Sequence, residues 1–431
     1  MSGTKVFEDL ESEVRNYCRH WPAVFSRAKG SHIYDEHGRD YLDFFAGAGV
    51  LNYGHNEPHL KAALLRYLQD DSIVHSLDMY TTAKRQFLEV FQQNILSPRG
   101  LDYKVQFSGP AGTIAVEAAL KLARKFTRRR TVVSFTTGFH GMTLGALALT
   151  GYAANGPGTQ SGDAVVLPYD QDHGGTTHGL LPLEHLLQDA SLDIPAAVIV
   201  ETVQGEGGMR TACASWLQDL ARLCKNHEML LIVDDIQMGC GRTGPFFSFE
   251  QSGIYPDIVC LSKSLSGYGL PLALTLLRPE LDIWEPGEHS GTFRGPNPAF
   301  VTAVAALDFW QDETFEKETL GKSQLLEHGV RSVALEYEDA VAEARGRGMA
   351  WGIVFREPEL ARQTCTNAFE RGLLVETNGF RRDVVKLMPP LTSTDEDIVM
   401  GLDILRHAIP ARHRKGAMPK TLVAKRTGTQ T

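Results

Sequence analysis

A lysine and two aspartates of this 431-residue chain stand where strand-like apolar stretches end. Lys263 follows the run DIVCLS (257–262), and Asp234 and Asp235 follow the run MLLIV (229–233). A lysine at the exit of a buried strand is hard to keep charged, because burial lowers the pKa of an ammonium group. Such an amine can form a Schiff base with an aldehyde, and a carboxylate can keep a pyridine ring protonated. Pyridoxal phosphate (PLP), an aldehyde on a pyridine ring, requires both a Schiff-base lysine and such a carboxylate.

The same residues have simpler interpretations. Most lysines at strand ends are solvated, and two aspartates after an apolar strand can bind Mg²⁺ or cap a helix. The order of three motifs favours PLP: DDIQ (234–237), then GCGRTG (239–244), then DIVCLSK (257–263). This order resembles the signature of class III (ω-amino-acid) PLP-dependent aminotransferases, in which the first motif usually reads DEVQ.

The resemblance assigns a role to each of three residues. It implies that Asp234 lies at the pyridine nitrogen, that Gln237 lies near the ring hydroxyl, and that Lys263 is the Schiff-base lysine. Asp235 is one methylene shorter than the glutamate usual in the family, and we expect it to be structural.

Two further motifs could hold the cofactor. Gly112 and Thr113 lie where a helix is expected to begin, and backbone N–H groups and the helix dipole favour a phosphate there. Small-residue turns before helices are common, but the resemblance implies that these two residues form the phosphate cup, with Ile114 in place of the usual Glu or Asn. It also implies that the ring of Phe139 stacks on the pyridine, with His140 beside it. By sequence alone, Phe139 is better explained as an ordinary core residue.

The substrate contacts are also inferred from motifs. ETVQGEGG (201–208) resembles the family's EPVQGEGG, in which the second glutamate pairs with a C-terminal arginine and swings away when a dicarboxylate binds. The corresponding C-terminal motif here is KLMPPL (386–391), with lysine in place of arginine. We therefore expect Glu201, Glu206 and Lys386 at the substrate. Lys386 keeps the positive charge but lacks the planar fork of a guanidinium.

The loop HSGTFRG (289–295) resembles the family's loop before a long interdomain helix. In that family the loop threonine reaches the phosphate of the neighbouring subunit. The match of Thr292 therefore implies a homodimer, or a higher oligomer, with shared active sites. Without the resemblance, Thr292 is equally a turn residue on the approach to a helix.

Three N-terminal segments narrow the resemblance: 10–19, 45–56 and 75–85 resemble the diaminobutyrate–2-oxoglutarate aminotransferases of ectoine biosynthesis. The likeness extends over nearly all of 8–410. It implies a ping-pong reaction that interconverts L-glutamate plus L-aspartate 4-semialdehyde with 2-oxoglutarate plus L-2,4-diaminobutyrate. The alternatives are another class III activity on ornithine, 4-aminobutyrate (GABA) or a broad range of ω-amines, a PLP decarboxylase or aminomutase, and a non-catalytic PLP-binding regulatory domain.

The elements that must position these residues alternate through the middle of the chain. We expect strands at 103–107, 132–135, 196–201, 229–234, 258–262 and 272–277, and helices at 114–126 and 216–227. This alternation predicts an α/β fold with a mostly parallel central sheet and helices on both faces. Ligands of such sheets bind beyond the carboxyl ends of the strands. With the resemblance, the expected fold is that of the fold type I PLP-dependent transferases, with a smaller α+β domain.

Weaker patterns flank this region. They predict a short polar helix at 9–17, a hairpin within 33–44, helices at 59–69 and 82–93, a helical stretch at 298–337 interrupted near 314, and an α+β unit with a strand at 350–355, a helix at 359–370 and a strand at 374–375. The expected division is an N-terminal segment that contributes to the small domain (1–56), a large PLP-binding domain (57–320), a C-terminal small domain (321–410) and a disordered tail (411–431).

Composition limits the classes of function. The chain is 43% hydrophobic and 22% charged, enough for two or three domains, and its net charge of −9 argues against a nucleic-acid partner. No apolar run approaches the roughly 20 residues that span a bilayer, and the N-terminus lacks a signal core. Six cysteines without a CxxC pair fit free thiols in a reducing compartment. We expect a cytoplasmic enzyme that acts on small molecules without a metal.

Overall fold

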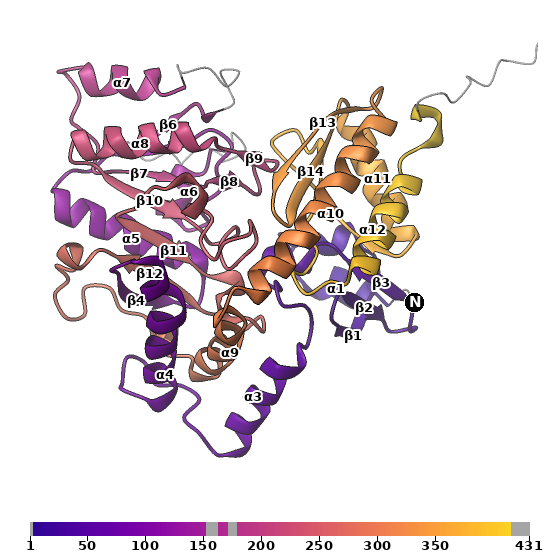
Figure 1. Cartoon of the computed structure of the whole chain (residues 1–431), viewed down its shortest axis with the longest axis horizontal. Helices are drawn as coiled ribbons and strands as arrows, with labels where there is room; N and C mark the ends of the chain where they lie inside the picture. The colour runs from indigo at the N-terminus through magenta and orange to yellow at the C-terminus, as the bar shows by residue number, and fades with distance from the viewer. Residues whose placement is uncertain (1–2, 152–162, 171–178, 415–431) are drawn as a thin grey trace, which may run out of the picture.

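A seven-stranded mixed sheet forms the larger part of the computed structural model, which describes residues 3–151, 163–170 and 179–414 (Figure 1). In spatial order its strands are β4 (Lys104–Gly109), β12 (Ala273–Leu277), β11 (Ile258–Leu261), β10 (Leu230–Asp234), β7 (Ala197–Val200), β5 (Val132–Phe135) and β6 (Ala164–Leu167). β12 runs antiparallel to both of its neighbours, and the other pairs are parallel. The predicted mostly parallel sheet is confirmed. The edge strand β6 has no counterpart in the sequence-based prediction.

Helices cover both faces of this sheet. Successive side chains of a strand point to opposite faces, so alternate residues of β10 enter different cores. Leu231 and Val233 pack in one core with Leu217 of α8 (Ala214–Asn226). Leu230 and Ile232 pack in the other core, which contains the alanine-rich buried side of α5 (Gly112–Thr127).

Beside the large sheet, α3 (Pro58–Gln69) and α4 (Thr82–Phe91) each pack on α9 (Asn297–Leu307). After a short 3-10 turn at Asp308–Trp310, the chain continues in α10 (Thr314–Glu336). Figure 1 shows α10 running from the neighbourhood of α9 toward the smaller part of the molecule. The predicted interruption near 314 is therefore confirmed.

Two four-stranded sheets form the smaller part. One has the order β13 (Val341–Arg347), β14 (Ala350–Phe355), β17 (Val384–Leu387) and β16 (Glu376–Asn378). The other has the order β1 (Phe25–Lys29), β2 (His32–Asp35), β3 (Asp40–Asp43) and β15 (Leu373–Leu374). Because β3 pairs with β15 in parallel, the N-terminal hairpin joins the C-terminal part of the chain. The exact domain boundaries stay a prediction.

Helices α11 (Pro358–Glu370) and α12 (Asp395–Ala408) complete the smaller part. Both ends of α12 are capped or charged favourably: the Thr394 side chain accepts the Asp397 N–H, acidic residues fill the first turn, and Arg406 and His407 lie in the last turn. Both ends thus complement the helix dipole.

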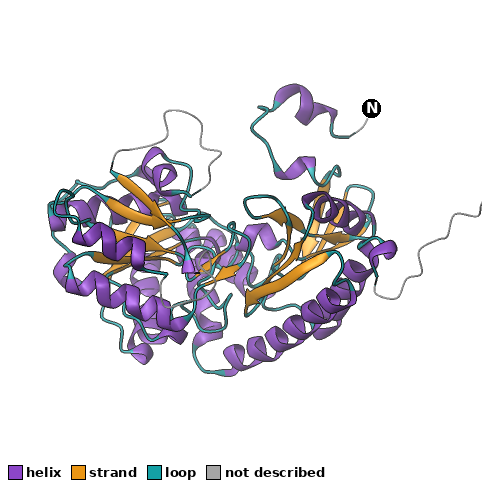
Figure 2. Ribbon diagram, turned by 90° about the horizontal axis from the view of Figure 1, so that it is seen from above, coloured by secondary structure: helices purple, strands orange, loops and turns teal. Residues whose placement is uncertain are grey.

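The predicted helix at 9–17 is wrong. The first helix, α1 (Lys5–Leu10), ends earlier because Glu11 is extended, and Figure 2 shows it standing off the body of the molecule. Tyr17 belongs to a short 3-10 turn, and its ring packs against Trp21 and Phe45. This aromatic packing, rather than local helix propensity, determines where the segment lies.

The first residues of the predicted tail are ordered. Ala411–His413 forms a 3-10 turn and Arg414 pairs with Glu336 at 2.6 Å, while 415–431, most of the predicted disordered tail, lies outside the described residues. No helix within 3–151, 163–170 and 179–414 combines the length and the apolarity that a membrane crossing requires.

Candidate active site

Two neighbouring strands bring the lysine and the aspartate together. β10 and β11 are parallel, with Asp234 opposite Cys260, so their carboxyl ends meet at one edge of the sheet. Asp234 is the last residue of β10, and Lys263 follows β11 by two residues. Lys263 adopts a left-handed conformation with φ of +47°, which is uncommon for a residue other than glycine. A backbone held in this way is a feature that clusters at functional sites.

Lys263 faces a cavity of about 290 Å³. Burial lowers the pKa of Lys263, with Glu206 opposing and Lys386 reinforcing the shift. The cavity is lined by Gly112, Thr113, Phe139, His140, Gly141, Met142, Glu201, Glu206, Asp234, Ile236, Gln237 and Lys263. Of the residues predicted for the site, all but Thr292 and Lys386 therefore meet here.

His140 fixes the carboxylate of Asp234. His140 Nδ1 lies 2.8 Å from Asp234 Oδ2, and both side chains are buried. Burial alone would lower the pKa of His140, but the hydrogen bond and charge of Asp234 raise it. The other carboxylate oxygen, Oδ1, accepts the N–H of Ile236 at 3.2 Å. The sequence placed His140 near the cofactor, and the structure adds its contact with Asp234.

Glu201 supports the wall that carries Phe139. Glu201 Oε2 accepts the backbone N–H of Phe139 at 2.9 Å. Burial raises the pKa of Glu201 to about 8, and the nearby Asp234 adds to the effect while His140 opposes it. The surroundings of Glu201 therefore favour its protonated form.

The N-terminus of α5 forms one end of the cavity. Its N-cap residue, Ala111, is extended and provides no side-chain cap, so the N–H groups of Gly112 and Thr113 are available to an anion, while the Ile114 N–H donates to the Ala111 carbonyl. A Cβ atom on Gly112 would lie 2.9 Å from a methyl group of Ile236, which explains the glycine. Thr113 Oγ1 lies 2.8 Å from Thr143 Oγ1.

Lys386 lies behind the cavity, on β17 of the sheet formed by β13, β14, β17 and β16. It is 2% exposed, and its Nζ lies 2.7 Å from Glu206 Oε1 and 2.6 Å from Glu376 Oε1. Burial alone would lower the pKa of Lys386, but the two carboxylates raise it. Burial alone would likewise raise the pKa of Glu206, yet Lys386 and Lys263 lower it to about 2. The predicted pairing of Glu206 with Lys386 is thus present in the structure.

Glu376 was not among the predicted site residues. It lies directly opposite Lys386 in the pairing of β16 with β17, and only this register could have identified it. Gln237 reinforces the same cluster, because its Nε2 donates to Glu206 Oε1 at 3.1 Å and to the Ala48 carbonyl at 2.9 Å.

Asp235 points away from the cavity. Its side chain is fully buried, and Oδ2 accepts the Ser248 N–H at 3.0 Å. Burial raises the pKa of Asp235 to about 7. Of the two adjacent aspartates, only Asp234 reaches the cavity.

Thr292 lies in a different place. It lines a groove with Ile114 and Glu117, outside the cavity of Lys263. Its backbone carbonyl accepts from His75 Nε2 at 2.7 Å, which ties the loop to the segment 73–80. Within one chain Thr292 does not meet the other predicted residues, and its contact with a neighbouring subunit stays a prediction.

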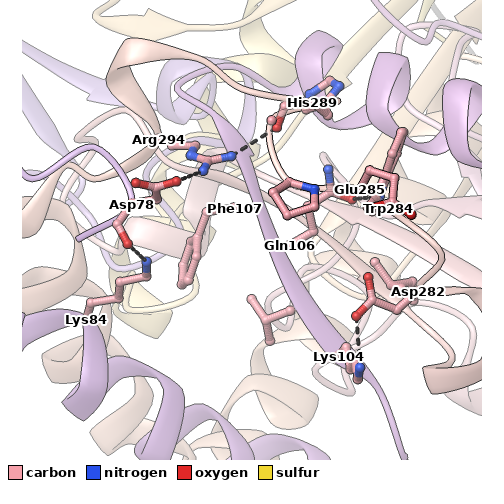
Figure 3. Close-up of a pocket in the computed structure, with 14 residues that line it drawn as sticks. Asp78, Lys84, Lys104, Gln106, Phe107, Asp282, Trp284, Glu285, His289 and Arg294 are labelled. Atoms are coloured by element: carbon pink, nitrogen blue, oxygen red, sulfur yellow. Dashed lines mark hydrogen bonds and ion pairs between the residues drawn. The ribbon is translucent and has the colours of Figure 1, made fainter. Parts of the chain in front are cut away.

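A further pocket, of about 500 Å³, lies beside this loop (Figure 3). Its charged side chains largely compensate one another: Arg294 pairs with Asp78, and Lys104 Nζ lies 2.8 Å from Asp282 Oδ2. Lys84 Nζ also donates to the Asp78 carbonyl at 3.1 Å. The pocket contains none of the predicted catalytic residues.

Comparisons with known proteins agree with this geometry. The model of the aminotransferase class-III family matches residues 14–409. The chain is 59% identical to a diaminobutyrate–2-oxoglutarate transaminase of Nocardia farcinica over 94% of both chains. It is 53% identical to the enzyme of that name from Halalkalibacterium halodurans, over 94% of this chain and 96% of the relative. Among solved structures, an ornithine aminotransferase from Toxoplasma gondii ME49 is 26% identical, with a TM-score of 0.81, over 94% of this chain and 93% of its own.

The chain therefore belongs to the class-III aminotransferase family, as its motifs predicted. It is an aminotransferase, and its cofactor is PLP. The cavity residues fit this cofactor: they combine an amine of lowered pKa, a fixed carboxylate, an aromatic ring and an uncapped helix N-terminus around one space.

Proposed function

We propose that the protein transfers an amino group from L-glutamate to L-aspartate 4-semialdehyde, giving 2-oxoglutarate and L-2,4-diaminobutyrate, and that the reaction is reversible. The names of relatives that are 52–59% identical over nearly the whole chain support this substrate pair. The structural observation that carries the proposal is the ion pair between Lys386 Nζ and Glu206 Oε1, 2.7 Å apart, beside the cavity of Lys263. This arrangement can serve both a dicarboxylate and a substrate without a second acidic group.

Each cavity residue has a task in this reaction. PLP supplies an aldehyde that condenses with amines and a pyridine ring that accepts the electron pair left when a proton departs. We assign Lys263 Nζ the transfer of that proton, because its lowered pKa makes a neutral amine available. Asp234 would keep the ring nitrogen of bound PLP protonated, and His140 Nδ1 holds the Asp234 carboxylate in place at 2.8 Å.

Other residues bind and orient. Phe139 provides a ring surface for stacking, and Glu201 holds its backbone. Gly112 and Thr113 would present the helix N-terminus to the phosphate, and Gln237, which lines the same cavity, would lie near the ring hydroxyl.

The Glu206–Lys386 pair is the switch between the two half-reactions. When glutamate or 2-oxoglutarate binds, its second carboxylate replaces Glu206 at Lys386. When diaminobutyrate or the semialdehyde binds, the pair stays closed. Exchange of one carboxylate for another leaves the buried ammonium compensated in both states, which avoids an unpaired buried charge.

We also propose a homodimer or higher oligomer in which Thr292 of one subunit reaches the phosphate site of another. Exposed apolar side chains beside the Thr292 loop support an interface there. They are Ile73, Val74, Met79, Tyr80 and Phe293. We further propose a cytoplasmic location and, from the N-terminal segments alone, a role in ectoine biosynthesis.

A panel of amino donors with 2-oxoglutarate as acceptor tests the proposed reaction. It compares 2,4-diaminobutyrate with ornithine, lysine, 4-aminobutyrate and β-alanine under identical conditions. We expect the highest kcat/KM with diaminobutyrate and transfer of its 4-amino group. A clear preference for ornithine or 4-aminobutyrate would leave the general class III activity and remove the specific assignment.

A further inference from the structure

A second cavity, of about 600 Å³, adjoins the cavity of Lys263. The two share Phe139, Met142, Glu206 and Lys263. The second cavity extends toward the small sheet, where β16 and the turn after it form its wall. A substrate whose amino group reaches Lys263 therefore has room for its other end in this space.

One side of this second cavity carries two carboxylates. Glu206 and Glu376 both line it, and both pair with the single ammonium of Lys386. The ammonium of Lys386 directly pairs with both carboxylates, and Lys263 is the other amine that acts on them from the same cavity. In this poorly solvated position charges interact strongly. Burial, with a contribution from the charge of Glu206, raises the pKa of Glu376, so a further cation beside this carboxylate would stabilise its charged form.

A guanidinium lies on the wall of the same cavity. Arg382 is exposed and makes no side-chain hydrogen bond or ion pair within 3–151, 163–170 and 179–414. Its neighbour Arg381, by contrast, lies 3.6 Å from Asp383. The backbone of Arg382 is held in a tight turn, with φ of +55° and an N–H that donates to the Gly379 carbonyl at 2.9 Å.

We propose that Glu376 and Arg382 bind the head group of the diamino acid: Glu376 binds the α-ammonium and Arg382 binds the α-carboxylate, while the 4-amino group reaches Lys263. This inference rests on the proposed function and names the part of the site that selects the substrate. An α-amino acid carries opposite charges on neighbouring atoms, and the cavity offers the complementary charges on two residues of one turn region. Simple ω-amines offer one of the two charges at most.

Substrate analogues that each lack one group test the two contacts separately. 4-Aminobutyrate is diaminobutyrate without the α-amino group, and 1,3-diaminopropane is diaminobutyrate without the carboxylate. The variants are Glu376→Gln, which removes the charge and nearly preserves the shape, and Arg382→Gln. Arg381→Gln is the matched control, because it removes a neighbouring guanidinium that pairs with Asp383.

We expect Glu376→Gln to lower kcat/KM for diaminobutyrate and 1,3-diaminopropane by about tenfold or more, the value of a charged hydrogen bond, and to leave 4-aminobutyrate nearly unchanged. Arg382→Gln should lower kcat/KM for diaminobutyrate and 4-aminobutyrate by roughly threefold to tenfold, since the contact is partly solvated, and spare 1,3-diaminopropane. Arg381→Gln should alter none of the three.

Equal losses on all three amines would overturn the proposal, because they indicate a general effect through Lys386 rather than recognition of the head group. Unchanged kinetics in both variants would overturn it as well. Cofactor absorbance and thermal unfolding report whether each variant is folded. If Glu376→Gln does not fold, Glu376→Asp replaces it, with a smaller loss expected on the same two amines. A wild-type enzyme inactive with diaminobutyrate refutes the proposed function instead, whatever the variants do with other amines.

Discussion

Replacement of Lys386 by glutamine should affect both stability and substrate choice. Its ammonium is 2% exposed and makes two short contacts, of 2.7 and 2.6 Å, to Glu206 and Glu376. Removal of one partner from a buried ion pair costs about 3–5 kcal/mol, because the remaining charges are uncompensated. Two charged hydrogen bonds at about 1.5–3 kcal/mol each give a similar sum. We expect a loss of this size in the free energy of unfolding, measured by denaturant titration at neutral pH.

The loss should depend on pH in a defined direction. In the wild type, the pKa of Glu206 is about 2, below its ordinary value of 4.5. A lowered carboxyl pKa contributes stability above the unfolded value, and this contribution disappears as the pH falls through the folded value. Lys386→Gln removes that contribution, so the difference in the free energy of unfolding between wild type and variant should be largest near neutral pH. It should narrow between about pH 4.5 and pH 2.

Kinetics separate the substrate effect from the loss of stability. Loss of one charged contact to a substrate carboxylate, about 1.5–3 kcal/mol, corresponds to roughly a tenfold to 150-fold rise in KM. In Lys386→Gln this rise should occur with glutamate and 2-oxoglutarate and be much smaller with diaminobutyrate. Lys386→Arg should restore much of the affinity, and Lys317→Gln, at an exposed i,i+4 pair, is the neutral control. An equal rise in KM for all substrates, or no destabilisation at neutral pH, would refute this account of the buried cluster.

Four other predictions concern the cofactor, the stability of the fold and the assembly. Lys263→Ala should lose several orders of magnitude in transamination, and peptide mapping after borohydride reduction of the wild-type holoenzyme should find the cofactor on Lys263. Asp234→Asn should still bind PLP but lose most of its turnover, whereas Asp235→Asn should be milder; the opposite ranking would contradict our assignment of the two carboxylates. The pKa of Asp235 is about 7 in the folded protein, above its ordinary 3.8, so the stability of the wild type should fall as the pH rises from about 4 to about 7. Asparagine does not titrate, so the free energy of unfolding of Asp235→Asn should rise relative to that of the wild type over the same range. Dilution to the monomer should release PLP if Thr292 serves a neighbouring subunit, and a fully active monomer in sedimentation would exclude this role.

Local sequence patterns predicted the elements that carry Lys263 and Asp234. Apolar runs of four or five residues that end in a charged side chain identify buried strands and their exits, and β10 and β11 lie where these runs predicted. The edge strand β6 was missed, since it is short and only partly buried. At 9–17 the polar residues suggested a helix, but the aromatic contacts of Tyr17 are tertiary and leave no local pattern.

Contacts between distant residues were harder to predict than elements. The Asp234–His140 hydrogen bond joins residues 94 positions apart, and only the fold brings them together. Lys386 and Glu206 were paired by resemblance to a family, not by any property of their own sequence. Glu376 was missed because its relation to Lys386 is a register of two antiparallel strands, which neither residue indicates alone.

The cross-strand position of Glu376 and Lys386 also bears on how substrate preference can change between related enzymes. The two residues occupy opposite positions on β16 and β17, so one hairpin-like unit carries the cation, its second carboxylate and the turn with Arg382. Lys263 and Asp234, to which we assign the proton transfer and the ring nitrogen, lie instead at the carboxyl ends of β11 and β10 in the seven-stranded sheet. Changes within the single segment 376–386 can therefore alter which amino acid the enzyme prefers while the residues at the ends of β10 and β11 stay the same. Residues 376–386 are therefore the segment to exchange between relatives when the substrate range of this enzyme is redesigned.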